Sequence, residues 1–282
     1  MEGRNSMRKE KRNLAITEIF MIALAVIWFV PIYYLIVTTL KTPQEATLSP
    51  LGLPKVFHFE NYVNAWSKMQ FPRAFGNTLF ITVCAVGILV ILGSMAGYAL
   101  ARTNSKMGSR IFLLFLAGLT VPFQMNIICL YKIVISLGLM NTAWAVILVD
   151  VAINMPQAVF LIKEFIESSV PIELEEAAIV DGCSVFKRFF TIVLPLLKPV
   201  LSTVIILVTL NVWNEFLTPL LFLQSRENGV ILQEVTRNIG QFSTDWTALF
   251  PMLMLGVAPL MIFYIFMQKY IINGVAAGAV KG

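Results

Sequence analysis

The sequence contains little charge and almost no histidine or cysteine. Only 13% of its 282 residues are Asp, Glu, Lys or Arg, whereas a soluble domain carries roughly a quarter. The hydrophobic share is 58%, and the mean hydropathy is +0.80. This composition excludes an ordinary soluble domain and predicts a protein of the lipid bilayer.

The scarcity of reactive residues also limits the chemistry that the chain can perform. The single histidine, His58, has no acidic or cysteine partner that we expect to act with it. The three cysteines lack the spacing of a metal site or disulfide framework, and we interpret them as small packing residues: Cys84, Cys129 and Cys183. We therefore expect no catalytic residue, no metal and no cofactor.

A phosphate-binding loop of the Gly-x-x-x-x-Gly-Lys-Ser/Thr type is also missing from the sequence. The chain therefore does not bind ATP by that route. The pI near 9.1 reflects charges that we assign to membrane topology, so we do not expect nucleic-acid binding.

Long apolar runs are what the sequence does have. A helix that crosses a hydrocarbon core about 30 Å thick needs about 20 mostly apolar residues. Six segments qualify: 17–40, 76–101, 111–134, 142–162, 199–223 and 247–268. The first is too long for the apolar core of a signal peptide and is predicted to be a retained anchor. The fold class predicted is all-α and integral to the membrane, with a six-helix domain over residues 17–268.

The distribution of Lys and Arg predicts the orientation. With the N-terminus inside, fourteen of the 21 basic residues lie on the cytoplasmic side: Arg4, Arg8, Lys9, Lys11, Arg12, Arg102, Lys106, Arg110, Lys163, Lys187, Arg188, Lys198, Lys269 and Lys281. Both termini, residues 1–16 and 269–282, are then cytoplasmic. The 163–198 loop is cytoplasmic as well, and residues 224–246 form an extracytoplasmic loop.

The 163–198 loop carries a pattern of small and acidic residues. Pro171 suits a helix start, Asp181-Gly182 suits its end, and Ser184 can cap a second helix that ends at Pro195. Small residues allow close approach by a partner, and a carboxylate can bond a basic group. A surface-lying amphipathic connector is the alternative. The residues predicted to couple this loop to a partner are Glu176, Ala177, Ala178, Asp181, Gly182 and Pro195.

This loop resembles the EAA loop of permease subunits of binding-protein-dependent ABC importers. The pattern is Glu-Ala-Ala, three residues, Gly, nine residues, Ile, one residue, Leu-Pro, and each fixed position is present between Glu176 and Pro195. The likeness is closest to the smaller permease of the maltose-permease-like carbohydrate group. It extends to five further segments: Asn77-Thr78, Gly97–Arg102, Val121-Pro122, Trp213–Phe216 and the tail Gly274–Gly282.

The resemblance implies a type I importer fold and several partners. These are a second permease in a heterodimer, two ATPase subunits that hydrolyse ATP and an extracytoplasmic sugar-binding protein, in a bacterial inner membrane. It also implies that the EAA loop and the C-terminal tail contact the ATPase, and that residues 224–246 contact the binding protein. A free apolar tail and a solvated outer loop are the alternatives.

Polar groups inside the predicted spans are candidates for a solute pathway, because ionisable groups are costly there. Two pairs with a spacing of four residues, each on one helix face, and two residues near the second pair form this set: Asp150 with Asn154, Asn211 with Glu215, and Trp213 and Asn214. Hydrogen bonding to a partner permease is an equal alternative. Pro122 and Pro156 predict kinks or unwinding in the third and fourth spans.

The function predicted is inward transport of a sugar or oligosaccharide. A non-sugar solute such as a glycerol phosphate ester is the alternative within the same family. A secondary carrier would use Asp150 or Glu215 for a coupling ion, but no internal repeat supports it. An intramembrane enzyme lacks a catalytic set.

Overall fold

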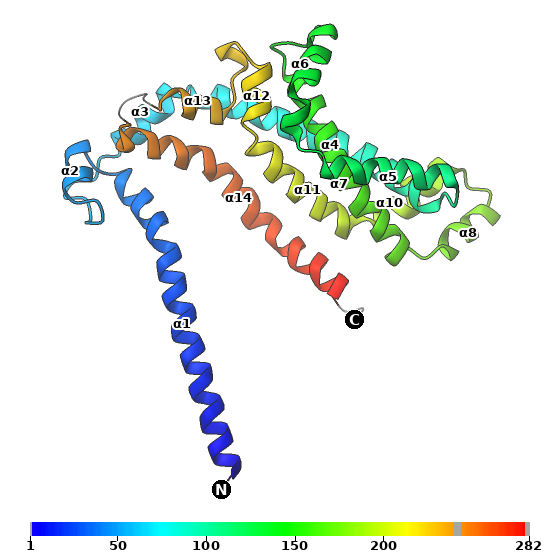
Figure 1. Ribbon diagram of the computed structural model, residues 1–282, viewed down its shortest axis with the longest axis horizontal. Helices are drawn as coiled ribbons and strands as arrows, with labels where there is room; N and C mark the ends of the chain where they lie inside the picture. The colour runs from blue at the N-terminus through cyan, green and yellow to red at the C-terminus, as the bar shows by residue number, and fades with distance from the viewer. Residues whose placement is uncertain (1, 240–243, 280–282) are drawn as a thin grey trace. The chain divides into compact units, whose positions relative to one another are not determined.

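The computed structural model describes residues 2–239 and 244–279, with side chains for residues 13–239 and 244–269. These residues form helices and connecting segments, without a β-strand (Figure 1). The chain divides into two units, Met1–Met69 with Arg237–Leu255, and Gln70–Thr236 with Gly256–Gly282.

The first unit holds α1 (Glu2–Thr38), α2 (Pro43–Leu48), α3 (Glu60–Lys68) and the start of α14 (Trp246–Ala279). The Asn13–Thr38 part of α1 is apolar enough to cross a membrane. Tyr34 of α1 meets Phe250 of α14 edge to face, with ring centroids 5.7 Å apart. The first and sixth predicted spans therefore correspond to continuous helices.

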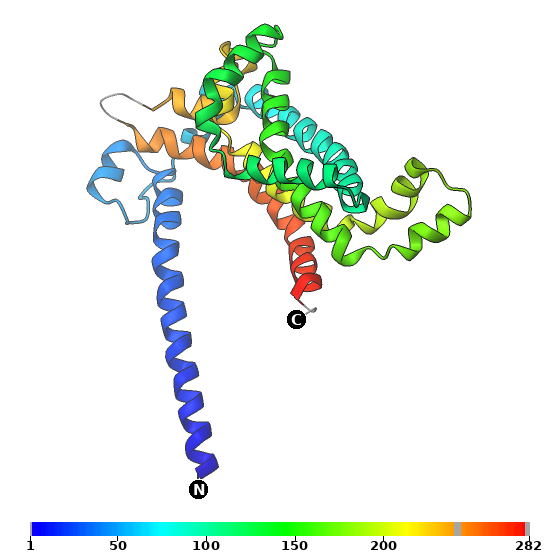
Figure 2. The ribbon, with the colours of Figure 1, turned by 45° about the vertical axis from the view of Figure 1, so that its right-hand side comes forward.

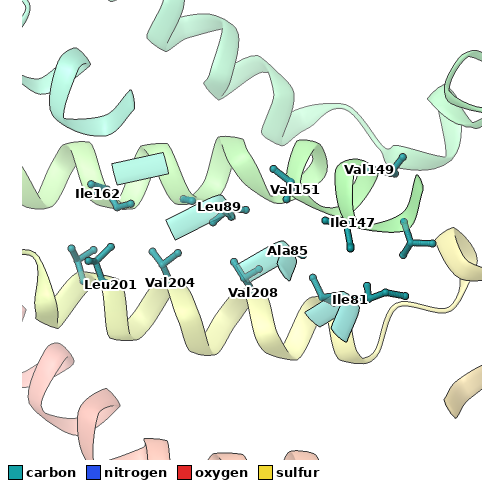
Figure 3. Packing of buried hydrophobic residues seen from close by; sticks show 14 of the residues in the cluster. Ile81, Ala85, Leu89, Ile147, Val149, Val151, Ile162, Leu201, Val204 and Val208 are labelled. Atoms are coloured by element: carbon teal, nitrogen blue, oxygen red, sulfur yellow. The ribbon is translucent and has the colours of Figure 1, made fainter. Parts of the chain in front are cut away.

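The core of the second unit lies between α4 (Phe71–Arg102), α7 (Ala143–Ser169) and α11 (Lys198–Trp213). Figure 3 shows apolar side chains of the three helices facing one another, among them Leu89, Ile147 and Val204. A Cβ added at Gly97 would lie 2.8 Å from Ile162 Cγ2. Glycine is therefore required where α4 and α7 cross.

The third predicted span is broken, as Pro122 predicts. It consists of α5 (Lys106–Thr120), the 3-10 helix η1 (Phe123–Asn126) and α6 (Ile127–Ser136), with a bend of 100°. The fourth span differs from expectation, because α7 continues through Pro156 without unwinding. Neighbouring helices can hold a proline-containing membrane helix together, and α7 packs against α4, α5 and α11.

The fifth predicted span, 199–223, is not one helix. A helical run consisting of α9 (Val185–Arg188), the π-helix η2 (Phe189–Val193) and α10 (Leu194–Leu196) bends by 77° into α11. The chain then leaves helical geometry after Trp213 and resumes it in α12 (Leu217–Phe222). The carboxylate of Glu215 accepts hydrogen bonds from the backbone N–H groups of Leu217 (2.7 Å) and Thr218 (3.1 Å). This side chain caps the new helix, which explains the interruption.

By length and composition, four described helices can cross a membrane, and the count reaches six if each bent pair is one span. Four of the six predicted spans therefore correspond to continuous helices, and the third corresponds to a bent pair. The fifth, 199–223, corresponds to α11 and α12, and the second bent pair begins in the predicted 163–198 loop. Of the predicted C-terminal tail, the backbone to Ala279 belongs to α14. Side chains beyond residue 269 and all of residues 280–282 lie outside the described part.

Two connectors join these helices within the second unit. The 170–190 connector contains α8 (Glu173–Val180) and follows α7. The 223–236 connector follows α12 and contains the 3-10 helix η3 (Arg226–Asn228) and most of α13 (Ile231–Arg237). In Figures 1 and 2, α8 projects from the end of α7, away from the core helices of this unit.

Candidate functional site

The 170–190 connector folds into two short helices with a sharp turn, as its sequence predicts. Helix α8 ends at Val180, and Gly182 has φ +74°, a left-handed conformation that glycine adopts without strain. The N–H groups of Gly182 and Cys183 donate to the carbonyls of Ile179 and Ala178, both at 2.9 Å. Ser184 then caps α9 by accepting from Lys187 N at 3.4 Å. The turn is therefore fixed by its own backbone bonds.

Several apolar side chains of this connector are exposed. Val180 is 87% exposed and Phe186 is 66% exposed, although large apolar side chains gathered on one surface usually have a partner. Five of the residues predicted to couple this loop to a partner are exposed, four in the connector and Pro195 in α10: Glu176, Ala177, Asp181, Gly182 and Pro195. Ala178 differs, because it is 5% exposed and faces the protein.

Glu175 anchors α8 to α4. It is 4% exposed, and its two carboxylate oxygens accept bonds from Arg102 Nε at 2.8 Å and from the Tyr98 hydroxyl at 2.6 Å. Arg102 also donates to the carbonyl of Val170 at 2.8 Å. The connector is thus exposed on one side and pinned on the other.

A second polar group lies where α7 meets α11. Asn211 Nδ2 donates to Asn154 Oδ1 at 3.0 Å, which joins the two helices. Asn154 also donates to the backbone carbonyl of Asp150 at 2.8 Å. Asp150 is 2% exposed, and its Oδ2 atom has no hydrogen-bond partner among the described residues.

Asn154 and Asn211 line a cavity of about 730 Å³ between α5, η1, α6, α7 and α11. The wall is largely apolar, with a few polar groups that include Asn126 and Gln157. Apolar walls with a few placed polar groups are typical of sites for small molecules.

The other predicted pathway residues do not line this cavity, although Glu215 lies close enough to Asp150 for the two carboxylates to interact. Trp213 is 7% exposed, and its Nε1 donates to the carbonyl of Gly256 at 3.2 Å. Asn214 donates to the carbonyl of Leu210 at 2.8 Å, and Glu215 caps α12. The structure therefore brings Asn154 and Asn211 to one cavity, next to Asp150, and gives Trp213, Asn214 and Glu215 local structural partners.

The 223–236 connector is fixed around a buried carboxylate. Glu234 is 0% exposed and forms ion pairs with Arg73 Nη2 at 2.5 Å and Arg226 Nη2 at 2.9 Å. The hydrogen bond with Glu234 raises the pKa of Arg226. Asn77 of α4 donates to the carbonyls of Glu227 at 2.8 Å and Gly229 at 3.0 Å.

His58 corrects one prediction from the sequence. Its Nδ1 lies 2.6 Å from Glu60 Oε1, so the histidine does have an acidic neighbour. This hydrogen bond lowers the pKa of Glu60. Glu60 is the first residue of α3, and His58 lies just before this helix. Within the described residues, no group of three His, Cys, Asp or Glu side chains could hold a metal ion.

Sequence reasoning missed the partners of Glu175 and Glu234. The six-residue stretch Gly97–Arg102 stood out only by resemblance, and Arg73 did not stand out at all. The sequence did contain one signal. A long apolar helix carries a basic residue near each end, Arg73 and Arg102, and both connectors contain acidic residues. This signal could not specify which acid pairs with which arginine.

Comparisons with known proteins agree with this architecture. Residues 89–276 match the family described as "Binding-protein-dependent transport system inner membrane component". The chain is 34% identical over 254 residues to the melibiose/raffinose/stachyose import permease protein MelC of Bacillus subtilis (strain 168), covering 90% of this chain and 92% of that protein. It is 31% identical over 281 residues to the diacetylchitobiose uptake system permease protein NgcG of Streptomyces coelicolor (strain ATCC BAA-471 / A3(2) / M145), covering 99% and 93%.

A solved structure shares the fold. It is a chain from the crystal structure of a bacterial ABC transporter involved in the import of the acidic polysaccharide alginate, with a TM-score of 0.80 and 18% identity. The similarity covers 93% of this chain and 98% of that chain, and supports the type I ABC importer permease fold. The family match over residues 89–276 and the relatives that span nearly the whole chain lead to one conclusion: this protein belongs to the family of inner membrane components of binding-protein-dependent transport systems.

Proposed function

We propose that this chain is a permease subunit of an ATP-driven importer and that it passes a sugar or oligosaccharide into the cell. Similar proteins are named for melibiose, raffinose and stachyose, for diacetylchitobiose and for arabinooligosaccharides. The cavity beside Asn154 and Asn211 supports this proposal, because amides can bond sugar hydroxyls and an apolar wall can accept the sugar ring faces.

The exposed side of the 170–190 connector is the observation that carries the proposal. Its exposed residues include Glu176, Ala177 and the apolar side chains of Val180 and Phe186. A small residue lets a partner approach closely, and a glutamate adds one charge-assisted bond. This surface fits a partner protein, and we assign to it an ATPase subunit that binds and hydrolyses ATP.

The complete transporter then contains a second permease, two ATPase subunits and an extracytoplasmic binding protein. In the topology that we propose, both termini and the 170–190 connector are cytoplasmic, and the 223–236 connector is extracytoplasmic. The 163–198 and 224–246 loops keep the roles that the sequence suggests. The substrate pathway runs past Asn154 and Asn211.

Reconstitution tests this proposal. The chain is purified with the permease, ATPase and binding protein encoded beside it, placed in liposomes and supplied with ATP inside or outside. Labelled raffinose and arabinotriose should enter only when ATP is on the ATPase side and the binding protein is on the other. Glu176→Arg should abolish uptake and ATPase co-purification while the chain stays inserted.

Glu164→Gln is the matched control, because Glu164 is also exposed and lies on α7, outside the connector. It should retain uptake. Wild-type uptake and normal ATPase association in Glu176→Arg would refute the coupling assignment, and uptake of neither sugar by an assembled wild-type complex would refute the substrate class.

A further inference from the structure

We propose that α4 is a strut that connects the two docking connectors, and that Glu175 and Glu234 are the positioning residues that fasten its two ends. The proposal rests on the function proposed above. It adds a mechanical route from the ATPase contact to the binding-protein contact. That route runs through α4 and does not require the polar cavity.

At one end of α4, Glu175 of α8 is held by two residues of the last turns of this helix. Tyr98 and Arg102 donate to different oxygens of the carboxylate, at 2.6 Å and 2.8 Å. Arg102 also bonds the carbonyl of Val170, where the connector leaves α7. Because Glu175 is 4% exposed, separating α8 from α4 would leave a charge without its partners in a buried place.

At the other end, the first two turns of α4 hold the 223–236 connector. Arg73 pairs with Glu234 at 2.5 Å, and Arg226 binds the same carboxylate from within the connector. The hydroxyl of Thr78 accepts a bond from Ile231 N at 3.1 Å. Because Glu234 is 0% exposed, separating this connector from α4 would likewise leave a buried charge without one of its partners.

Between these ends α4 is one unbroken helix of 32 residues, about 48 Å long at a rise of 1.5 Å per residue. It packs tightly against α7 at Gly93 and Gly97, where added Cβ atoms would meet α7 side chains at 3.4 Å and 2.8 Å. By contrast, the third predicted span is bent by 100°, and the fifth loses helical geometry between α11 and α12. Among these, α4 is suited to carry a displacement from end to end.

The expected consequence concerns the response to the binding protein. When a loaded binding protein docks on the 223–236 connector, α4 passes the displacement to α8 and so changes the ATPase rate. A neutral amide at position 175 or 234 keeps the side-chain shape but removes the charge that holds the arginine. The docking surfaces remain, and the communication between them weakens.

The test uses the whole complex in lipid nanodiscs. The ATPase rate per assembled complex is measured with and without sugar-loaded binding protein, for wild type, Glu175→Gln, Glu234→Gln and the double variant. We expect normal assembly, an unchanged basal rate and a loss of stimulation of at least about fivefold in each single variant. Because both ends serve one route, the double variant should lose little more than either single variant.

An exposed carboxylate outside both connectors provides the matched control. Glu164→Gln on α7 should keep wild-type stimulation, because its side chain is exposed and lies in neither connector. If Glu175→Gln or Glu234→Gln does not insert, Tyr98→Phe decides the question, since it removes only the hydroxyl that bonds Glu175. It should insert normally and lose part of the stimulation.

The strut proposal would be overturned if assembled Glu175→Gln and Glu234→Gln complexes showed wild-type stimulation. If these variants do not insert, wild-type stimulation in Tyr98→Phe would overturn it. Additive losses in the double variant would also overturn it, because they would indicate two separate routes. If the wild-type complex itself shows no stimulation by binding protein, the proposed function fails. If the wild type responds and these variants respond equally, only the strut fails.

Discussion

The two connectors of the second unit are built in opposite ways. The 170–190 connector exposes apolar side chains such as Val180 and Phe186 and is pinned by one buried carboxylate. The 223–236 connector buries Ile231, Gln233 and Glu234, and Gln233 donates to the carbonyls of Pro219 and Leu223. The 170–190 connector thus leaves apolar side chains exposed for a partner, whereas the 223–236 connector buries several of its side chains in its own packing.

This difference separates two uses of charge. On the 170–190 connector, the exposed Glu176 stabilises little within the chain, because exposed ion pairs contribute about 0–1 kcal/mol. In the 223–236 connector, Glu234 holds two arginines in a buried place. Substitutions should therefore affect function without stability in the first connector, and stability together with function in the second.

The largest effect is expected from a substitution in α4, because both connectors are bonded to this helix. Gly97→Leu places a large side chain where even a Cβ would lie 2.8 Å from Ile162, at a cost of more than about 3 kcal/mol from overpacking. We expect loss of folded protein, measured by size-exclusion chromatography of detergent-solubilised membranes. Gly87→Leu is the control, because a Cβ there meets nothing within 4 Å. Equal yields for the two variants would contradict the close packing of α4 on α7.

The next effect sharpens the contrast between the connectors. Glu234→Ala leaves Arg73 and Arg226 without their shared carboxylate and should destabilise the chain by about 3 kcal/mol. Glu176→Ala should change stability by less than about 0.5 kcal/mol and still abolish uptake. Thermal unfolding of the purified complex, followed by tryptophan fluorescence, measures both. Similar melting temperatures for the two variants would contradict the distinction between the exposed 170–190 connector and the packed 223–236 connector.

A smaller effect tests the turn of the 170–190 connector. Gly182→Val forces a branched residue to φ +74°, which costs about 1–2 kcal/mol. Because nothing lies within 4 Å of the added Cβ, the cost is backbone strain and not a clash. We expect impaired uptake with normal insertion. Gly182→Asn should recover much of the activity, because asparagine tolerates the left-handed conformation, and equal uptake by both variants would exclude strain as the cause.

The sequence predicted much of this arrangement, and its failures have identifiable causes. Local signals were sufficient for the Gly182 turn, the Ser184 cap and the break near Pro122, because backbone geometry and nearby hydrogen bonds determine them. The continuity of α7 through Pro156 depends on packing by other helices, and the end of α11 depends on Glu215 capping α12. The Glu175 and Glu234 pairs join residues 73 and 161 positions apart, so hydropathy and motif spacing carried no information about them.

A small stability effect is also expected for the polar residues inside the spans, which belong to neither connector. Asn211→Leu removes the bond to Asn154 and should cost about 0.6 kcal/mol, yet it changes the wall of the 730 Å³ cavity. We expect the KM for sugar uptake to rise with normal ATPase association. Trp213→Phe should leave that KM unchanged, because the indole bonds the carbonyl of Gly256 and does not line the cavity. The reverse pattern would place the pathway on the Trp213 side of α11 and would remove Asn154 and Asn211 from it.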